Sequence, residues 1–123
     1  MDIRYKESIK QLPVDDFIVR LKKEEILAAA KRAGYDFGEK LPKKALVARL
    51  AQVYSFFPQQ VRKCLSGEAL ELLESMQQND CEAVGGAQGE ELLLQMGMAM
   101  LLKGDDEAEV LVTSRRLLQA LLG

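Results

Sequence analysis

The clearest hydrophobic pattern in the first half of the chain has the period of an α-helix, and it occurs twice, over residues 23–33 and 43–54. Gly34 follows the first segment and can take the left-handed conformation that ends a helix. The pattern therefore predicts two amphipathic helices joined by a connector over residues 35–41. The apolar positions are Ile26, Leu27, Ala30 and Ala33 in the first segment, and Leu46, Val47, Leu50 and Val53 in the second.

Two shorter helices are predicted ahead of this pair. The first covers residues 5–11 and is stopped by Pro13, because the residue before a proline is held in an extended conformation. The second covers residues 15–21. We expect the carboxylate of Asp15 to cap its N-terminus.

Helical segments continue after residue 55. A short helix or turn is predicted over residues 58–64, and a longer helix over 67–78, with Ser66 as its N-terminal cap. Residues 79–89 contain three glycines, which predicts a loop with one helical turn over residues 81–84. A further helix is expected over residues 88–96.

The hydrophobic period changes towards the C-terminus. Residues 98–102 and 110–113 are apolar runs separated by a charged, turn-rich segment, which predicts a β-hairpin over about 98–113. Ser114 is then expected to cap a final helix over residues 115–122.

These elements predict a mainly α fold, a small helical domain with one β-hairpin near its C-terminus. The 123 residues amount to one ordinary domain. We expect a helix–loop–helix segment in residues 1–54 and a second helical half in residues 55–123, with one shared core. Aromatic residues are sparse and tryptophan is absent, so that core should consist mainly of leucine, alanine and methionine.

Charge is distributed unevenly along the chain, although the net charge is only −2. Residues 20–49 carry nine basic and four acidic side chains, whereas residues 55–123 carry five basic and eleven acidic ones. Such asymmetry often marks a basic contact surface beside an acidic body, and it also occurs in ordinary solvated surface. Charge alone therefore leaves both nucleic-acid and protein partners open.

Several classes of function are disfavoured by composition. The chain has no histidine, which removes the commonest general base and metal ligand. Cys64 and Cys81 do not form a C-x-x-C pair, and unpaired thiols are favoured over a disulfide between them. We therefore expect no enzymatic activity, metal site or cofactor. The chain also lacks an apolar run of about 20 residues and a signal-peptide pattern at its start, so we expect a cytoplasmic protein without membrane segments.

Residues 21–50 contain three short motifs in order: Leu21-Lys22-Lys23-Glu24-Glu25-Ile26, Ala33-Gly34-Tyr35 and Leu46-Val47-Ala48-Arg49-Leu50. This order resembles the SAP-type helix–extended loop–helix motif, and the N-terminal domain of the Rho termination factor has a similar pattern. The resemblance implies binding of DNA or RNA by backbone amides and basic side chains near the loop and the start of the second helix. The positions concerned are Gly38, Lys40, Lys43 and Lys44, with Arg49 nearby.

The order of helix, loop, helix, hairpin and helix in residues 55–123 resembles a winged helix. In winged helices that bind DNA, the second long helix enters the major groove and the hairpin touches phosphate. Here that helix begins with Glu90-Glu91 and the hairpin tip is Asp105-Asp106-Glu107, so a duplex would be repelled. A winged half in this chain is therefore expected to be a packing element or a protein-docking element.

We predict a non-catalytic protein-interaction or scaffolding module, the N-terminal part of a longer protein, that is monomeric or weakly dimeric. The alternative is a nucleic-acid-binding or regulatory module that uses the basic 20–49 segment. One contiguous positive face would favour nucleic acid, whereas scattered charges would favour a protein partner. The candidate contact residues are Lys31, Arg32, Lys40, Lys43, Lys44 and Arg49.

Overall fold

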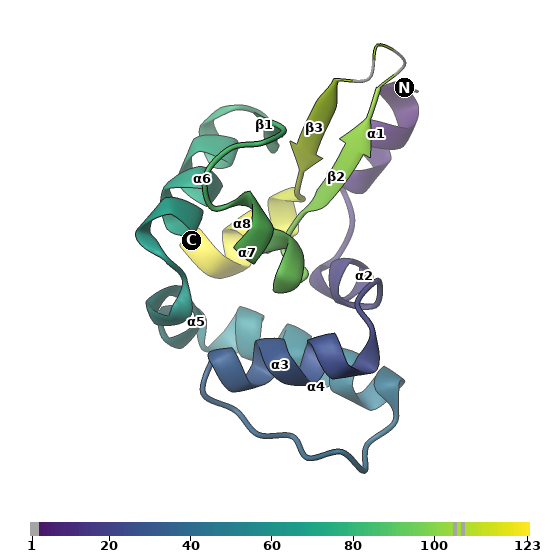
Figure 1. The fold of residues 1–123 in the computed structure, drawn as a ribbon, viewed down its shortest axis with the longest axis vertical. Helices are drawn as coiled ribbons and strands as arrows, with labels where there is room; N and C mark the ends of the chain where they lie inside the picture. Colours follow the sequence, from purple (N-terminus) through teal and green to yellow (C-terminus); the bar gives the residue numbers. More distant parts are fainter. Residues whose placement is uncertain (1–2, 105, 107) are drawn as a thin grey trace.

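The structure is a computed structural model that describes residues 3–104, 106 and 108–123 (Figure 1). It confirms a mainly helical fold with a small antiparallel sheet towards the C-terminus. The helices are α1 (Ile3–Ile9), α2 (Val14–Ile18), α3 (Lys23–Arg32), α4 (Lys43–Phe56), α5 (Pro58–Cys64), α6 (Gly67–Gln78), α7 (Glu90–Gln95) and α8 (Arg115–Leu122). The strands are β1 (Glu82–Val84), β2 (Met100–Lys103) and β3 (Glu109–Val112).

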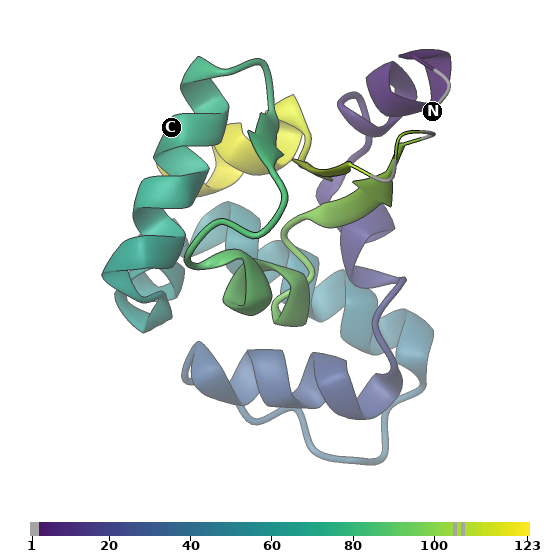
Figure 2. The ribbon, with the colours of Figure 1, turned by 45° about the horizontal axis from the view of Figure 1, so that its top comes forward.

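The two helices predicted from the strongest pattern, α3 and α4, form one end of the molecule (Figure 1). Helix α3 ends as predicted at Gly34, where φ is 93° and the N–H of Tyr35 donates to the carbonyl of Ala30 at 2.8 Å. The connector then returns along α3, since the ammonium of Lys23 donates to the carbonyl of Glu39 at 2.9 Å. As a result α3 and α4 run in broadly the same direction (Figure 2).

The start of α2 differs from the expectation. The predicted capping residue Asp15 lies inside the helix, and Pro13 occupies the N-cap position without any side-chain hydrogen bond. A proline there holds the extended conformation from which a helix can begin, so a carboxylate cap is not required. Two other predicted caps are confirmed. The hydroxyls of Ser66 and Ser114 each accept a hydrogen bond at 3.1 Å, from the N–H groups of Ala69 and Leu117.

The predicted hairpin is present as β2 and β3, but it belongs to a three-stranded sheet of order β1-β3-β2. The expected helical turn over residues 81–84 is wrong, because these residues contain β1, which pairs with β3. Asp80 and Cys81 both have positive φ, 54° and 67°, and this pair turns the chain from α6 onto the sheet. Of the acidic hairpin tip, Asp105 and Glu107 lie outside the described residues.

Buried residues from both halves of the chain form one hydrophobic core cluster. Helix α4 is at its centre, since it contacts α2, α3, α5 and α8. One hydrogen bond crosses this core. The fully buried hydroxyl of Tyr54 on α4 donates to the carbonyl of Met96, just after α7, at 2.6 Å. This bond ties the α3–α4 end of the molecule to the segment that leads into the sheet.

Replacing Tyr54 by phenylalanine should lower the free energy of unfolding by about 1–3 kcal/mol, because the buried carbonyl of Met96 would lose its partner. Urea denaturation followed by circular dichroism measures the change. Tyr5→Phe is the matched control, since Tyr5 is 47% exposed, and it should have no measurable effect. Equal stability of the two variants would mean that the Tyr54 bond contributes nothing.

Candidate interaction surfaces

Three of the predicted basic residues come together at the start of α4. Lys40 lies in the connector, and Lys43 and Lys44 are the first two residues of the helix; all three are exposed. The first turn of α4 contains no acidic residue, so these charges add to the positive end of the helix dipole. No ion pair to any of the three is found within the described part of the chain.

The other three predicted residues lie elsewhere. Lys31 and Arg32 are in the last turn of α3, about 12 Å along the helix axis from Lys23, which anchors the connector beside Lys40. Arg49 is exposed on α4 but points about 120–140° around the axis from Lys43 and Lys44. Three of the six residues therefore form a cluster at the start of α4, and the other three are separate from it. The six do not form one continuous basic face.

A second surface, which the sequence did not single out, is the aromatic corner formed by Tyr35, Phe56 and Phe57. Phe56 is 72% exposed and Phe57 is 53% exposed, and the rings of Tyr35 and Phe57 lie 6.2 Å apart. The corner exists because α4 stops before Pro58, which disfavours helical conformation at the preceding residue, Phe57. The only signal in the sequence was the run Ser55-Phe56-Phe57-Pro58, which interrupts the helical pattern.

Two hollows flank the aromatic corner. One, of about 400 Å³, lies between α2, α4 and α8 and is lined by Val14, Ala48, Ala51, Phe56 and Ala120 among others. The other, of about 360 Å³, is formed by Phe56, Phe57, Pro58 and the first residues of α5. Phe56 is shared by both hollows. An exposed aromatic side chain between two concave surfaces is the arrangement expected of an anchor residue in a protein interface.

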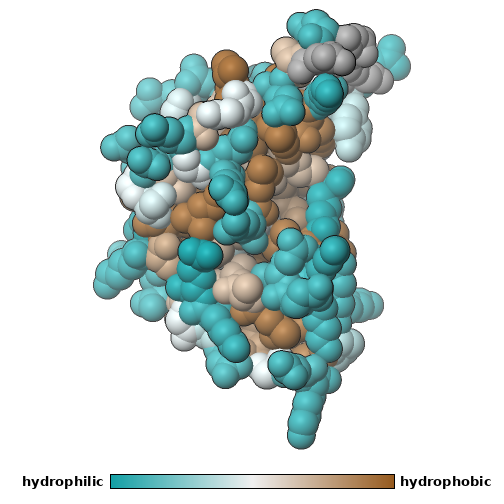
Figure 3. All heavy atoms as spheres, viewed as in Figure 1, coloured by the Kyte–Doolittle hydropathy of each residue, from teal (hydrophilic) through white to brown (hydrophobic). Residues whose placement is uncertain are grey.

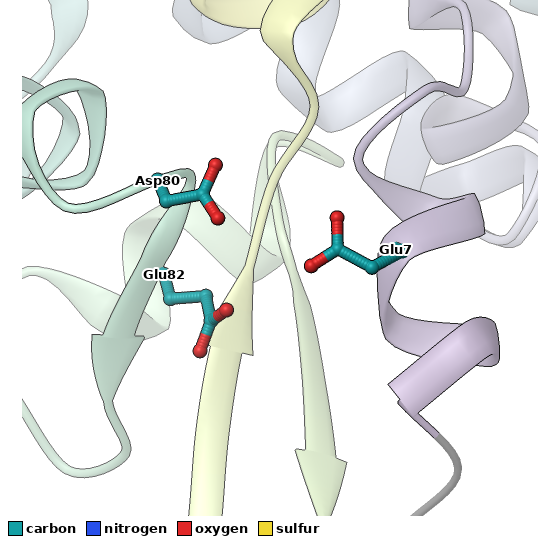
Figure 4. A group of neighbouring side chains, drawn as sticks. All are labelled: Glu7, Asp80 and Glu82. Carbon is teal, nitrogen blue, oxygen red and sulfur yellow. The ribbon is translucent and has the colours of Figure 1, made fainter.

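The structure also contains a group of three carboxylates with the spacing of a metal site. Glu7 from α1, Asp80 from the turn before β1 and Glu82 from β1 itself point towards one another (Figure 4), with oxygen atoms within 4.8 Å. The space between them is taken by the fully buried Lys10. Its ammonium donates to Glu82 at 2.5 Å, to Asp80 at 3.0 Å and to Glu7 at 3.1 Å. The chain thus supplies its own cation to this group.

Further contacts make this ion cluster a junction between distant segments. Lys6 pairs with Glu82 at 3.1 Å, and Arg115 at the start of α8 pairs with Asp80 at 2.8 Å. The backbone carbonyl of Lys10 also accepts from the N–H of Arg115 at 3.0 Å. Helix α1 is therefore held against both the β1 turn and α8 through Lys10. The arrangement indicates a structural role, because every hydrogen of the Lys10 ammonium has a carboxylate partner.

The electrostatics of the cluster agree with this role. Burial alone would lower the pKa of Lys10, but its bonds to Glu82, Asp80 and Glu7 raise that pKa above the ordinary value of 10.5. The hydrogen bond from Lys10 lowers the pKa of Asp80 below 3.8. Burial would raise the pKa of Glu82, but hydrogen bonds from Lys10 and Lys6 hold it below 4.5.

These shifts predict loss of stability in acid. Asp80 and Glu82 have lower pKa values in the folded than in the unfolded chain. Their contribution to the free energy of unfolding is therefore present above the unfolded pKa values of 3.8 and 4.5. This contribution is lost as the pH falls through the lower pKa values of the folded chain. Urea midpoints measured from pH 7 downwards should therefore begin to decrease near pH 4.5. The contribution of Lys10 has the opposite sign: it is complete below pH 10.5 and lost above the raised pKa.

Comparison of the chain with protein-family models, with curated proteins and with solved structures finds no match in any of the three. Within the described ranges, no helix combines the length and the apolar character needed to cross a lipid bilayer. The surfaces described above are therefore interpreted from their own chemistry.

Proposed function

We propose that this chain is a non-catalytic protein-interaction domain whose contact surface is the aromatic corner. The observation that carries the proposal is the exposure of Phe56, 72% of which is open to solvent between two hollows. Aromatic side chains are enriched in protein interfaces, and a few such anchors supply most of the binding energy. The absence of histidine and the separation of Lys31, Arg32 and Arg49 from the three lysines at the start of α4 support the same assignment.

The test is affinity capture with the tagged full-length chain from its source cells, read out by quantitative mass spectrometry. Phe56→Ser is the informative variant, because Phe57 also packs against Tyr35 and its loss could disturb the fold. Proteins that bind through the aromatic corner should be recovered at roughly one tenth of the parent amount, a loss of about 1.4 kcal/mol. Val19→Ser is the matched control, since Val19 is a 47% exposed apolar residue directly after α2.

The recovered protein is then purified, and its affinity for the three forms of the chain is measured by calorimetry. Direct binding that is weakened by Phe56→Ser and kept by Val19→Ser supports the proposal. Partners retained equally by Phe56→Ser would show that the aromatic corner is not the contact surface.

A second candidate function is nucleic-acid binding through Lys40, Lys43 and Lys44. It is favoured by the clustering of three exposed lysines at a helix N-terminus that has no acidic residue in its first turn. Fluorescence anisotropy with labelled oligonucleotides at about 50 mM salt should then show micromolar binding that weakens as salt rises. Changing all three lysines to glutamate should abolish it, whereas Lys31→Glu with Arg32→Glu should weaken it less. No binding at high micromolar protein would eliminate this candidate.

A further inference from the structure

The largest of the hollows described here lies away from the aromatic corner, between α6 and the strands β1 and β3. Its volume is about 680 Å³. The walls are mostly apolar side chains, and the viewed face in Figure 3 shows hydrophobic atoms gathered over the sheet region. The apolar lining residues are Leu72, Ala83, Val84, Ala87, Ala108 and Val110. We call this hollow the β1 groove.

Strand β1 forms an open edge beside the β1 groove. Its partner β3 is in the middle of the sheet, and two hydrogen bonds frame the pairing: Thr113 N–H to the carbonyl of Cys81 at 3.0 Å, and Gly85 N–H to the carbonyl of Glu109 at 2.8 Å. Because bonded and non-bonded residue pairs alternate in an antiparallel ladder, Val84 is in a non-bonded pair. Its N–H and C=O therefore point away from β3.

The outward backbone groups of β1 are available to a ligand. The N–H of Glu82 donates to the carbonyl of Asn79 at 3.2 Å, but its own carbonyl and both backbone groups of Val84 have no hydrogen-bond partner among the described residues. Val84 is 81% exposed, the highest value of any large hydrophobic residue that the structure describes. An exposed strand edge with an apolar residue is a template for pairing with another strand.

The charge around the β1 groove selects the kind of strand that would pair. Two carboxylates, of Glu82 and Glu109, line the groove, and no lysine or arginine is among its described lining residues. Glu68 and Glu71 lie beside Leu72 on the same side of α6, by helical phase. Glu82 is already paired with Lys6 and Lys10, whereas Glu109, Glu68 and Glu71 have no ion pair within residues 3–104, 106 and 108–123.

Besides Lys6 and Lys10, which are held on Glu82, the sheet carries Lys103 on β2, the opposite edge strand. Lys103 lies opposite Glu109 across β2 and β3, but no ion pair joins the two in the structure. The carboxylates therefore outnumber the bases around the groove, and the edge faces a negative potential. A ligand that carries positive charge on both sides of an apolar side chain complements this surface.

We propose that the β1 groove binds an extended peptide segment in which lysine or arginine lies two residues before and two residues after an apolar residue, so that all three side chains point to the same face of the strand. The peptide adds to β1 as a fourth strand, with hydrogen bonds to the carbonyl of Glu82 and to the N–H and carbonyl of Val84. Its apolar side chain enters the groove, and its basic side chains face Glu109, Glu68 and Glu71. Strand addition of this kind takes its affinity from main-chain bonds and its selectivity from alternate side-chain pockets.

The experiment uses three fluorescent synthetic peptides and the full chain. The first, of seven residues, has a central valine with a lysine two residues before it and another two residues after it, and serine at the other positions; the second replaces the lysines by glutamates, and the third replaces the valine by glycine. Anisotropy should show saturable binding of the lysine–valine peptide, with an affinity about tenfold or more above that of either other peptide. Amide shifts in an NMR titration should centre on residues 82–86. Equal binding of the glycine peptide, or shifts centred on Phe56 and Phe57, would overturn the proposal.

Two variants test the geometry of the edge. Val84→Pro removes the outward N–H and leaves the ladder to β3 intact, since that N–H does not bond to β3. Val84→Lys keeps the backbone and adds a repelling charge at a side chain that is 81% exposed, so it should fold normally. Both should weaken the lysine–valine peptide about tenfold, whereas Val19→Lys should not. Unchanged affinity in the folded Val84→Lys variant would contradict strand addition at β1.

Discussion

Replacement of Lys10 by methionine is expected to lower the free energy of unfolding by about 3 kcal/mol, at the lower end of the range for breaking a buried ion pair. Lys10 is fully buried, and without its ammonium the carboxylates of Glu7, Asp80 and Glu82 would face one another with no cation between them. Lys6 on Glu82 and Arg115 on Asp80 would then offset part of their charge. The cost is expected at the lower end of that range because the side chains of Glu7 and Asp80 are 46% and 61% exposed, so water can solvate part of their charge.

The pH dependence of the Lys10→Met variant separates this electrostatic effect from lost packing. Methionine retains the length of the lysine stem, so the packing contribution is largely kept. Protonation of Asp80 and Glu82 relieves the repulsion within the cluster, and the difference from the parent chain should shrink below about pH 4.5. Lys31→Met, at an exposed site, is the control and should change stability by no more than about 0.5 kcal/mol. A deficit for Lys10→Met that is the same at pH 7 and pH 3.5 would contradict the electrostatic explanation.

The second large effect is expected from truncation of the core. Leu46 on α4 and Leu73 on α6 are both fully buried. Replacing either by alanine removes buried methyl groups and leaves a cavity, which should cost about 2–5 kcal/mol. Thermal or urea unfolding measures the loss. Val19→Ala, at a 47% exposed position, should remain within about 0.5 kcal/mol of the parent. If the leucine variants have the same unfolding midpoints as this control, the assignment of α4 and α6 to one core is wrong.

Local signals in the sequence were sufficient for most of the helices. The boundaries of α5 and α6 agree with the prediction, and the stop at Gly34 is also as expected, because these features depend on residues within one or two turns. Strand β1 was missed because three residues are too few to show a period, and its partner β3 lies about 28 residues further along the chain. Its presence depends on the positive φ angles of Asp80 and Cys81, which pattern reasoning does not provide.

The candidate sites were less predictable than the fold. A lysine near a short N-terminal helix normally points into water, and nothing in the run Ser8-Ile9-Lys10 indicates partners 70 and 72 residues away. The basic 20–49 segment was visible as composition, but only the return of the connector along α3 determines which lysines lie together. The aromatic corner likewise depends on where α4 stops in space.

Whether the aromatic corner is a protein-binding surface is the central claim, and site-specific photo-crosslinking in the source cells tests it most directly. A photoreactive phenylalanine analogue at position 56 keeps the aromatic ring, and the same analogue at positions 19 and 44 provides an apolar and a basic control site. The proposed function predicts one or a few discrete protein adducts through position 56 on irradiation and none through position 19. Absence of protein adducts through position 56, together with nuclease-sensitive adducts through position 44, would contradict it and favour a nucleic-acid partner.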